Sequence, residues 1–143
     1  MKVVDSTFLI GLLLGEPNAA KKGAELDATG GAATSVVSVF QVSCGVSRMM
    51  RDPGKRLGEL KRLVANLEML PLSVEASLRA SEICGVYVGS GRWINPFDAM
   101  VAGIAVTCGA ESLVTRMAAA YDLVSGLKLE DYMKSAFLCK NNL

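Results

Sequence analysis

Short runs of apolar and β-branched residues alternate along this chain with longer segments of helical periodicity. The short runs predict strands at residues 2–4, 34–37, 69–72, 112–115 and 127–129. The longer segments predict helices at residues 8–14, 18–29, 39–50, 55–67, 75–88 and 95–108. Short apolar strands that alternate with helices are typical of a parallel sheet covered on both faces. We therefore expect an α/β fold, a three-layer α/β/α sandwich with a central parallel sheet of four to five strands.

Polar residues at the predicted helix starts are candidates for N-caps. Asn18 and Ser38 stand at two of these starts, and Ser73 opens a third. In the helix that follows Asn18, the apolar positions predict a buried face. The charged residues of that helix, Lys21, Lys22, Glu25 and Asp27, are expected to face solvent.

Composition limits the chain to one folded domain, residues 1–143. A length of 143 residues with half of them apolar is enough to form a single core. The formal net charge is +1, so no general basic field attracts nucleic acid. Any contact with nucleic acid must therefore be local.

The chain contains no histidine, which excludes Ser-His-Asp triads and imidazole metal ligands. Its cysteines form no CxxC pair, so neither a zinc site nor a thiol redox motif is expected. The apolar run near the start is too short to span a bilayer and lacks the basic region of a signal peptide. We expect a cytoplasmic protein with no membrane partner, in which four reduced cysteines are small core residues: Cys44, Cys84, Cys108 and Cys139.

Two acids stand where an open parallel sheet binds its ligands, beyond the carboxyl ends of strands. Asp5 ends the first strand, and Asp98 lies in the first turn of the most apolar helix. A carboxylate in so apolar a segment needs a partner, and Mg²⁺ is often held by one or two carboxylates. Each acid also has a structural interpretation. Asp5 can be an N-cap, and Asp98 with Asn95 forms a possible capping box.

Four blocks of the sequence together resemble the PIN-domain family, and within it the VapC-like toxins, over about residues 1–132. The blocks are VVDSTFLIGLL, TSVVSVFQVSCGV, INPFDAMVAGIAV and SLVTRMAAAYDLVSGLKLEDY. In that family an opening acid, a central glutamate, a later aspartate and a group after the last inner strand converge on magnesium and hydrolyse RNA. The resemblance assigns these roles to Asp5, followed by Ser6, and to Asp98. It also implies Mg²⁺ or Mn²⁺ as cofactor, RNA as substrate, a homodimer and an antitoxin partner.

The sequence departs from the family's pattern at the acidic positions. Gln41 stands where the family has its glutamate, and an amide oxygen can ligate a cation without adding negative charge. In the last block Thr115 and Arg116 are retained and Tyr121 is the expected aromatic residue. The two polar positions of that block are lost, at Met117 and Ala120. We therefore expect one weakly bound ion at most.

Another acid could replace the missing one. Asp122 lies two residues beyond the expected place and could turn inward if the short turn shifts. Glu111 lies at the other end of the predicted strand, roughly 13 Å from its carboxyl end at about 3.3 Å per residue.

Arginines near the predicted site are candidates for holding RNA. Arg116 follows the last inner strand, and Arg92 precedes the Asp98 helix together with Trp93. The alternative is that the arginines are solvated and Trp93 packs in the core or an interface. The basic face of residues 55–62 is either a phosphate track or simply solvated.

Apolar residues at 8–14 and the pair Met49 and Met50 suit either a protein partner or the core. Two functions remain open at this point. One is a magnesium-dependent endoribonuclease of the VapC type, with Gln41 and Thr115 as neutral helpers. The other is a catalytically inactive PIN domain that binds RNA or protein. A site for a small phosphorylated ligand lacks a glycine-rich loop.

Overall fold

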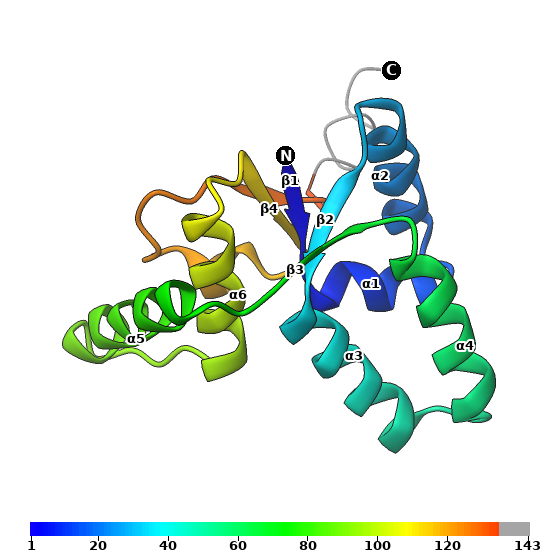
Figure 1. Ribbon diagram of the computed structural model, residues 1–143, viewed down its shortest axis with the longest axis horizontal. Helices are drawn as coiled ribbons and strands as arrows, with labels where there is room; N and C mark the ends of the chain where they lie inside the picture. Colours follow the sequence, from blue (N-terminus) through cyan, green and yellow to red (C-terminus); the bar gives the residue numbers. More distant parts are fainter. Residues whose placement is uncertain (135–143) are drawn as a thin grey trace.

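A five-stranded parallel sheet forms the centre of the protein (Figure 1). The computed structural model describes residues 1–134. The strands follow the order β3-β2-β1-β4-β5, and all four neighbouring pairs are parallel. Their bounds are β1 Lys2–Val4, β2 Ala32–Ser35, β3 Glu68–Leu70, β4 Ser112–Thr115 and β5 Leu129–Asp131. The expected α/β sandwich with a parallel central sheet is confirmed.

Helices cover both faces of this sheet (Figure 1). In the described part of the chain they are α1 Ser6–Leu13, α2 Pro17–Ala28, α3 Val36–Met49, α4 Pro53–Val64, α5 Val74–Gly89 and α6 Pro96–Thr107, with a short 3₁₀ helix, η1, at Ala118–Tyr121. Not one of the helices within residues 1–134 is long and apolar enough to cross a membrane.

The alternation of side chains along the strands divides the core in two. Val3, Ala33 and Leu113 lie side by side in register and pack against α5 and α6. Val4 and its neighbour Val114 point to the opposite face, where the core contains residues of α1 to α4. Because a strand exposes alternate residues to alternate faces, three-residue strands are enough to bury both layers.

The boundary between β2 and α3 lies earlier than the β-branched run predicts. Ser35, not Ser38, caps α3, because its Oγ accepts the Ser38 amide N–H at 3.0 Å. Val36 and Val37 therefore belong to the first turn of the helix. Asn18 is likewise not a cap, since α2 begins at Pro17. Ser73, expected only to open its helix, caps α5 by accepting the Ala76 amide N–H.

Lys22 is not solvent-facing as expected but is only 8% exposed. Its Nζ lies 2.8 Å from Oε2 of Glu130 in β5. Glu130 also pairs with Lys2 and accepts a hydrogen bond from the Ser112 hydroxyl at 2.6 Å. This buried network places the last strand at Leu129–Asp131 instead of residues 127–129.

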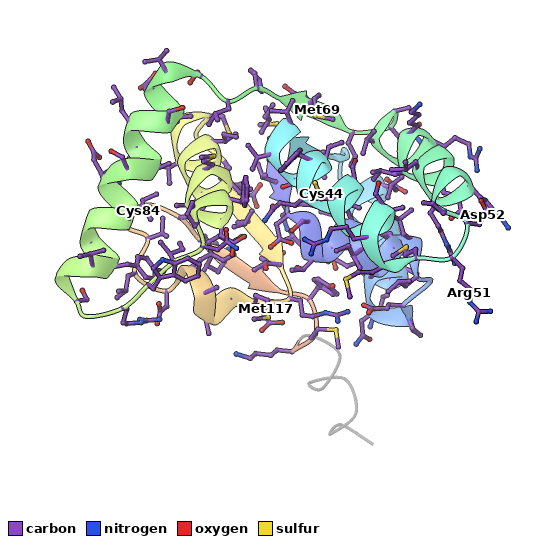
Figure 2. All side chains as sticks on the ribbon, turned by 90° about the horizontal axis from the view of Figure 1, so that it is seen from below. Cys44, Arg51, Asp52, Met69, Cys84 and Met117 are labelled. Carbon is purple, nitrogen blue, oxygen red and sulfur yellow. The ribbon has the colours of Figure 1, made fainter. Side chains whose placement is uncertain are left out.

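The cysteines do not all lie in the core. Cys44 and Cys108 are exposed and Cys84 is half-buried, so the prediction is wrong for the first two (Figure 2). In α3 the buried positions are Val42 and Val46, which places Cys44 on the opposite side of the helix. Cys139 lies outside the described residues.

Candidate metal centre

Asp5 stands at the carboxyl end of β1 and caps α1. Its Oδ1 accepts hydrogen bonds from the Thr7 hydroxyl at 2.6 Å, the Thr7 amide at 3.0 Å and the Phe8 amide at 3.2 Å. The structural interpretation of Asp5 is therefore correct, but it involves one carboxylate oxygen only. The other oxygen, Oδ2, is approached by the Tyr121 hydroxyl at 3.4 Å.

Asp98 lies in the first turn of α6 but does not complete a capping box. Asn95 caps that helix by accepting the Phe97 amide N–H at 2.9 Å. The Asp98 carboxylate instead accepts a hydrogen bond from Nε2 of Gln41, in α3, at 3.2 Å. The structure thus brings together two residues that lie 57 positions apart in the sequence.

Oxygen acceptors outnumber hydrogen-bond donors between these side chains. Oε1 of Gln41 is buried and has no partner among the described residues. Oδ2 of Asp5 has only the long contact with Tyr121. Buried acceptors without donors are costly, and a hard cation satisfies them. Asp5, Asp98 and Gln41 therefore fit one Mg²⁺ or Mn²⁺ ion that keeps several of its waters. Within residues 1–134 no three His, Cys, Asp or Glu side chains gather closely enough to hold a metal ion by themselves.

The electrostatics of the two carboxylates agree with this arrangement. Burial raises the pKa of Asp5, hydrogen bonds from Thr115, Thr7 and Phe8 lower it in part, and the charge of Asp98 raises it further. Burial also raises the pKa of Asp98, against hydrogen bonds from Gln41 and Tyr121. A nearby cation would favour the charged form of both groups.

Tyr121 is the residue of this centre that the sequence analysis missed. It is 2% exposed, its hydroxyl contacts Oδ2 of Asp5 at 3.4 Å, and it lowers the pKa of Asp98. Burial raises its pKa far above the usual value, and the two carboxylates add to the effect. In the sequence Tyr121 stands out only as an aromatic residue after three alanines.

Thr7 holds the Asp5 carboxylate in place, and Thr115 lies beside Thr7. Thr115 is fully buried at the end of β4, its Oγ1 lies 3.5 Å from the Thr7 hydroxyl, and it accepts the Met117 amide N–H at 2.9 Å. The Thr7 hydroxyl in turn accepts the Arg116 amide N–H at 3.0 Å. Ser6 is buried, and its hydroxyl makes no hydrogen bond in the described part of the chain.

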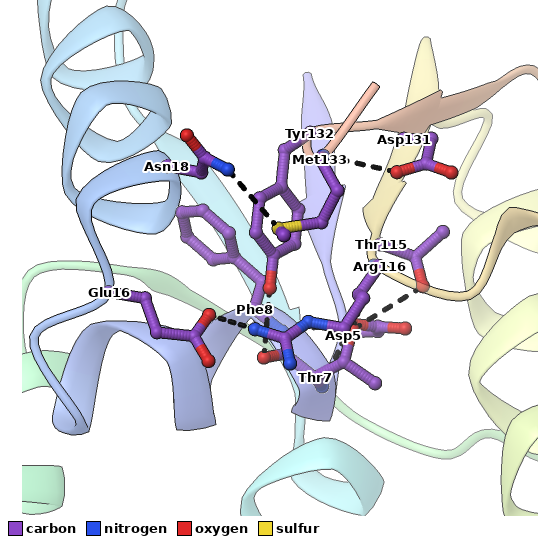
Figure 3. Close-up of polar contacts among 10 residues, drawn as sticks. All are labelled: Asp5, Thr7, Phe8, Glu16, Asn18, Thr115, Arg116, Asp131, Tyr132 and Met133. Carbon is purple, nitrogen blue, oxygen red and sulfur yellow. Dashed lines mark hydrogen bonds and ion pairs between the residues drawn. The ribbon is translucent and has the colours of Figure 1, made fainter. Parts of the chain in front are cut away.

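The two candidate RNA-binding arginines are both paired with carboxylates. Arg116 forms an ion pair with Glu16 beside the centre (Figure 3), and its Nε is buried without a partner among residues 1–134. Arg92 pairs with Asp122 at 2.9 Å and lies over the Tyr87 ring, 5.4 Å from the ring centroid. Asp122 therefore does not take the place of the missing acid.

The remaining sequence candidates lie around or far from the centre. Trp93 is 73% exposed and so is not a core residue. Met117, one of the two positions where the family's polar residue is lost, is exposed after β4 (Figure 2). Glu111 bonds through its amide to the carbonyl of Met1, at the opposite end of β4, as expected.

Comparison with known families identifies the class of protein. The family described as "PIN domain" matches residues 2–116, so the chain belongs to the PIN domain family. No protein in a search of curated sequences matches the chain significantly.

Solved structures show the same fold. The VapBC complex from Salmonella typhimurium bound to DNA matches with a TM-score of 0.80 at 20% identity, over 92% of this chain and 97% of the other. VapBC2 from Rickettsia felis, bound to a DNA fragment from its promoter, has a TM-score of 0.79 at 20% identity, over 90% and 96%. VapBC-5 from Mycobacterium tuberculosis has a TM-score of 0.66 at 21% identity, over 90% and 95%.

Proposed function

We propose that this PIN domain is a VapC-like endoribonuclease that hydrolyses RNA with one weakly held Mg²⁺ or Mn²⁺ ion. The observation that supports it most is the donor-poor centre at the carboxyl ends of the strands. There the buried Asp5, the half-buried Asp98 and the unpartnered Oε1 of Gln41 bring oxygen acceptors that few donors satisfy. Such a set of oxygens suits a hard cation and has no evident structural purpose of its own.

Three side chains would hold the ion: Asp5 through Oδ2, Asp98, and Gln41 through Oε1. When bound, the cation would lower the pKa of a water and neutralise charge that develops on the phosphodiester. The Thr7 hydroxyl and the Thr7 and Phe8 amides fix the Asp5 carboxylate by donating to Oδ1, which leaves Oδ2 with only the long Tyr121 contact. With two carboxylates rather than four, the affinity for the ion is low and a second ion is not expected.

RNA phosphates would be held by Arg116 and Arg92. The guanidinium of Arg116 lies beside the centre and Arg92 lies next to the exposed Trp93, whose ring is free to stack on a base. Because Glu16 and Asp122 already pair with these arginines, a phosphate has to displace a carboxylate at each position. Binding of RNA is therefore expected to be weak and dependent on salt.

A helix of an antitoxin is the partner that suits the surface over α1, α2 and α4. A groove of about 330 Å³ lies there, lined by apolar side chains that include Phe8, Leu12, Leu26, Leu63 and Leu67. An amphipathic helix binds to such a groove through its apolar face. The solved VapBC-5 from Mycobacterium tuberculosis belongs by name to a family of toxin–antitoxin systems, which supports the same assignment.

A second copy of the chain is the other proposed partner. Several large apolar side chains of α3 and α5 are exposed, among them Phe40, Met49, Leu78, Val86 and Val88. A homodimer would remove these from water. Of the two segments predicted to suit a partner or the core, residues 8–14 serve mainly the core, since Phe8 and Leu9 are buried and only Leu14 is clearly exposed.

We also propose a cytoplasmic location, where the proposed RNA substrate occurs.

A second candidate function is a binding module without nuclease activity. It is favoured by one observation: after β4 the nearest acid in the sequence, Asp122, pairs with Arg92, and the Tyr121 hydroxyl contacts Oδ2 of Asp5 instead. In this case the arginines would still hold RNA, but no cleavage would follow.

Cleavage of structured RNA in Mg²⁺ or Mn²⁺ separates the two functions. The proteins to compare are wild type, Asp5→Asn, Asp98→Asn and the control Glu75→Gln, which removes an exposed carboxylate in α5. We expect cleavage by wild type and the control, and a loss of at least about 100-fold in both aspartate variants. Equal background in all four proteins contradicts the nuclease and favours the binding module.

A further inference from the structure

The two oxygens of the Asp5 carboxylate have very different surroundings. Oδ1 accepts three hydrogen bonds, of 2.6, 3.0 and 3.2 Å. Oδ2 has a single donor, the Tyr121 hydroxyl, at 3.4 Å. This distance is longer than the usual O–H···O separation of about 2.7–2.8 Å, so the hydrogen bond is weak.

The same hydroxyl lowers the pKa of Asp98, against the effect of burial. A phenol has one proton to donate, and that proton is directed at Oδ2 of Asp5. Tyr121 therefore satisfies the Asp5 carboxylate only in part.

The position of Tyr121 is fixed by its neighbours rather than by these contacts. Its ring is 2% exposed and belongs to the core beside α5 and α6. The hydroxyl of the buried Tyr87 donates to the carbonyl oxygen of Ala120 at 2.7 Å and accepts the Leu123 amide N–H at 3.3 Å. The backbone on both sides of Tyr121 is thus held, and the phenol hydroxyl is kept directed at the carboxylates.

We infer that Tyr121 is the residue that sets the cation affinity of this centre, because its hydroxyl competes with the cation for Oδ2 of Asp5. This inference rests on the proposed role of Asp5 and Asp98 as metal ligands. A cation held at Oδ2 would draw on the electron density that the phenol proton engages, so binding would weaken the Tyr121 contact. Removal of the hydroxyl leaves the negative charge on Oδ2 of Asp5 without its hydrogen-bond donor, so a bound cation would stabilise that charge more.

The competing hydrogen bond predicts the size of the effect. A hydrogen bond to a charged group that is lost on binding lowers affinity by roughly three- to tenfold when it is long and weak. Tyr121→Phe should therefore bind Mn²⁺ about three to ten times more tightly than wild type. If the hydroxyl merely orients the carboxylates for the ion, the same substitution should weaken binding instead.

Tyr132→Phe is the matched control. Tyr132 is 3% exposed, and its hydroxyl donates to the carbonyl oxygen of Thr7 at 3.3 Å. The substitution removes a buried phenol hydroxyl from the same region without changing the donors of either aspartate. Its Mn²⁺ affinity should equal that of wild type.

The experiment is a Mn²⁺ titration of the full chain, followed by electron paramagnetic resonance of the free ion, on wild type, Tyr121→Phe, Tyr132→Phe and Asp5→Asn. Tighter binding in Tyr121→Phe alone supports the inference. Binding that Asp5→Asn abolishes, with Tyr121→Phe equal to or weaker than wild type, overturns the inference and leaves the metal centre standing. Binding that Asp5→Asn leaves unchanged, or no binding in any of the four proteins, overturns the metal centre and the inference with it.

A second readout needs no variant. In wild type, the ¹³Cζ resonance of Tyr121 reports the hydrogen bonding of its hydroxyl during a titration with diamagnetic Mg²⁺. We expect this resonance to shift as the contact with Asp5 breaks, while that of Tyr132 stays in place. Saturation with Mg²⁺ without a change at Tyr121 contradicts the competition.

Discussion

Gln41 donates its side-chain N–H to the carboxylate of Asp98 across the space between α3 and α6, with Nε2 and Oδ1 3.2 Å apart. The amide thus compensates the half-buried Asp98 carboxylate in part, while its own Oε1 stays without a partner among residues 1–134. A neutral group at this position keeps two acids together in the absence of an ion. It also limits the negative charge that attracts one.

Gln41→Glu should therefore strengthen ion binding. A third carboxylate adds attraction for Mg²⁺, so the Mg²⁺ concentration needed for half-maximal RNA cleavage should fall by about tenfold. Without the ion, the like charges of Glu and Asp98 should lower the melting temperature. Titration of cleavage against Mg²⁺, with Gln41→Ala as the control that removes the ligand altogether, measures this. An unchanged Mg²⁺ requirement contradicts a ligand role for residue 41.

If the proposed function is right, the ion pair between Glu16 and Arg116 should restrain RNA binding. Glu16→Gln releases the guanidinium beside the centre, and we expect the Kd for RNA to fall by about two- to fivefold at low salt. Arg116→Ala should weaken binding by a similar factor or more. Filter binding with an uncleavable RNA tests both, and Glu75→Gln is the control for the loss of one negative charge. Weaker binding by Glu16→Gln would show that the pair positions Arg116 instead of restraining it.

Glu130 contributes stability that depends on pH. Burial alone would raise its pKa, but hydrogen bonds from Lys22, Ser112 and Lys2 outweigh burial and lower the pKa from 4.5 to about 2. Because the pKa in the folded state lies below that of the unfolded chain, the contribution is fully present above about pH 4.5 and is lost as the pH falls to about 2. The shift corresponds to a free energy of unfolding of roughly 2–3 kcal/mol.

Glu130→Gln tests this contribution. Urea unfolding of wild type and the variant should differ by roughly 2–3 kcal/mol at pH 7, and the difference should shrink steadily between pH 4.5 and pH 2. A difference that stays constant over this range shows that the network stabilises by packing rather than by charge.

Close packing of α5 on α6 depends on Gly103. A Cβ added there would lie 2.5 Å from the Ala76 carbonyl oxygen and 3.0 Å from the Ala80 amide nitrogen, both backbone atoms. Gly103→Ala should therefore lower the free energy of unfolding by roughly 1–3 kcal/mol. Gly85→Ala is the control, because Gly85 is exposed in α5 and its added Cβ meets nothing within 4 Å. That control should be neutral or stabilising by up to about 1 kcal/mol.

Local patterns were enough to predict the sheet but not the detail at its edges. The runs at Lys2–Val4 and Ser112–Thr115 are strands with the predicted bounds, because short apolar runs of this kind are typical of buried strands in a parallel sheet. Val36 and Val37 favour a strand by propensity, yet the Ser35 cap draws them into α3. Lys22 faces the core because β5 brings Glu130 to it, a partner 108 residues away that periodicity does not reveal.

The same limit applies to the centre. Asp5 and Asp98 could be found from their places after a strand and in an apolar helix, and the structure shows both carboxylates close to the Tyr121 hydroxyl. Glu16 and Tyr121 could not be found in this way, because neither has a local signal of chemistry. Their importance comes from contacts with Arg116 and Asp5, which lie 100 and 116 residues away in sequence.

The most direct test of metal-dependent RNA cleavage at this centre is the cleavage rate as a function of Mg²⁺ concentration in wild type and Asp98→Asn. Asp98 accepts a hydrogen bond from Gln41, and Tyr121 lowers its pKa. The substitution keeps the shape of the side chain while removing its charge. If Asp98 holds the ion, the wild-type rate should rise with Mg²⁺ into the millimolar range, and the variant rate should stay at background at every concentration. A variant that cleaves RNA at the wild-type rate with the same Mg²⁺ dependence would contradict it.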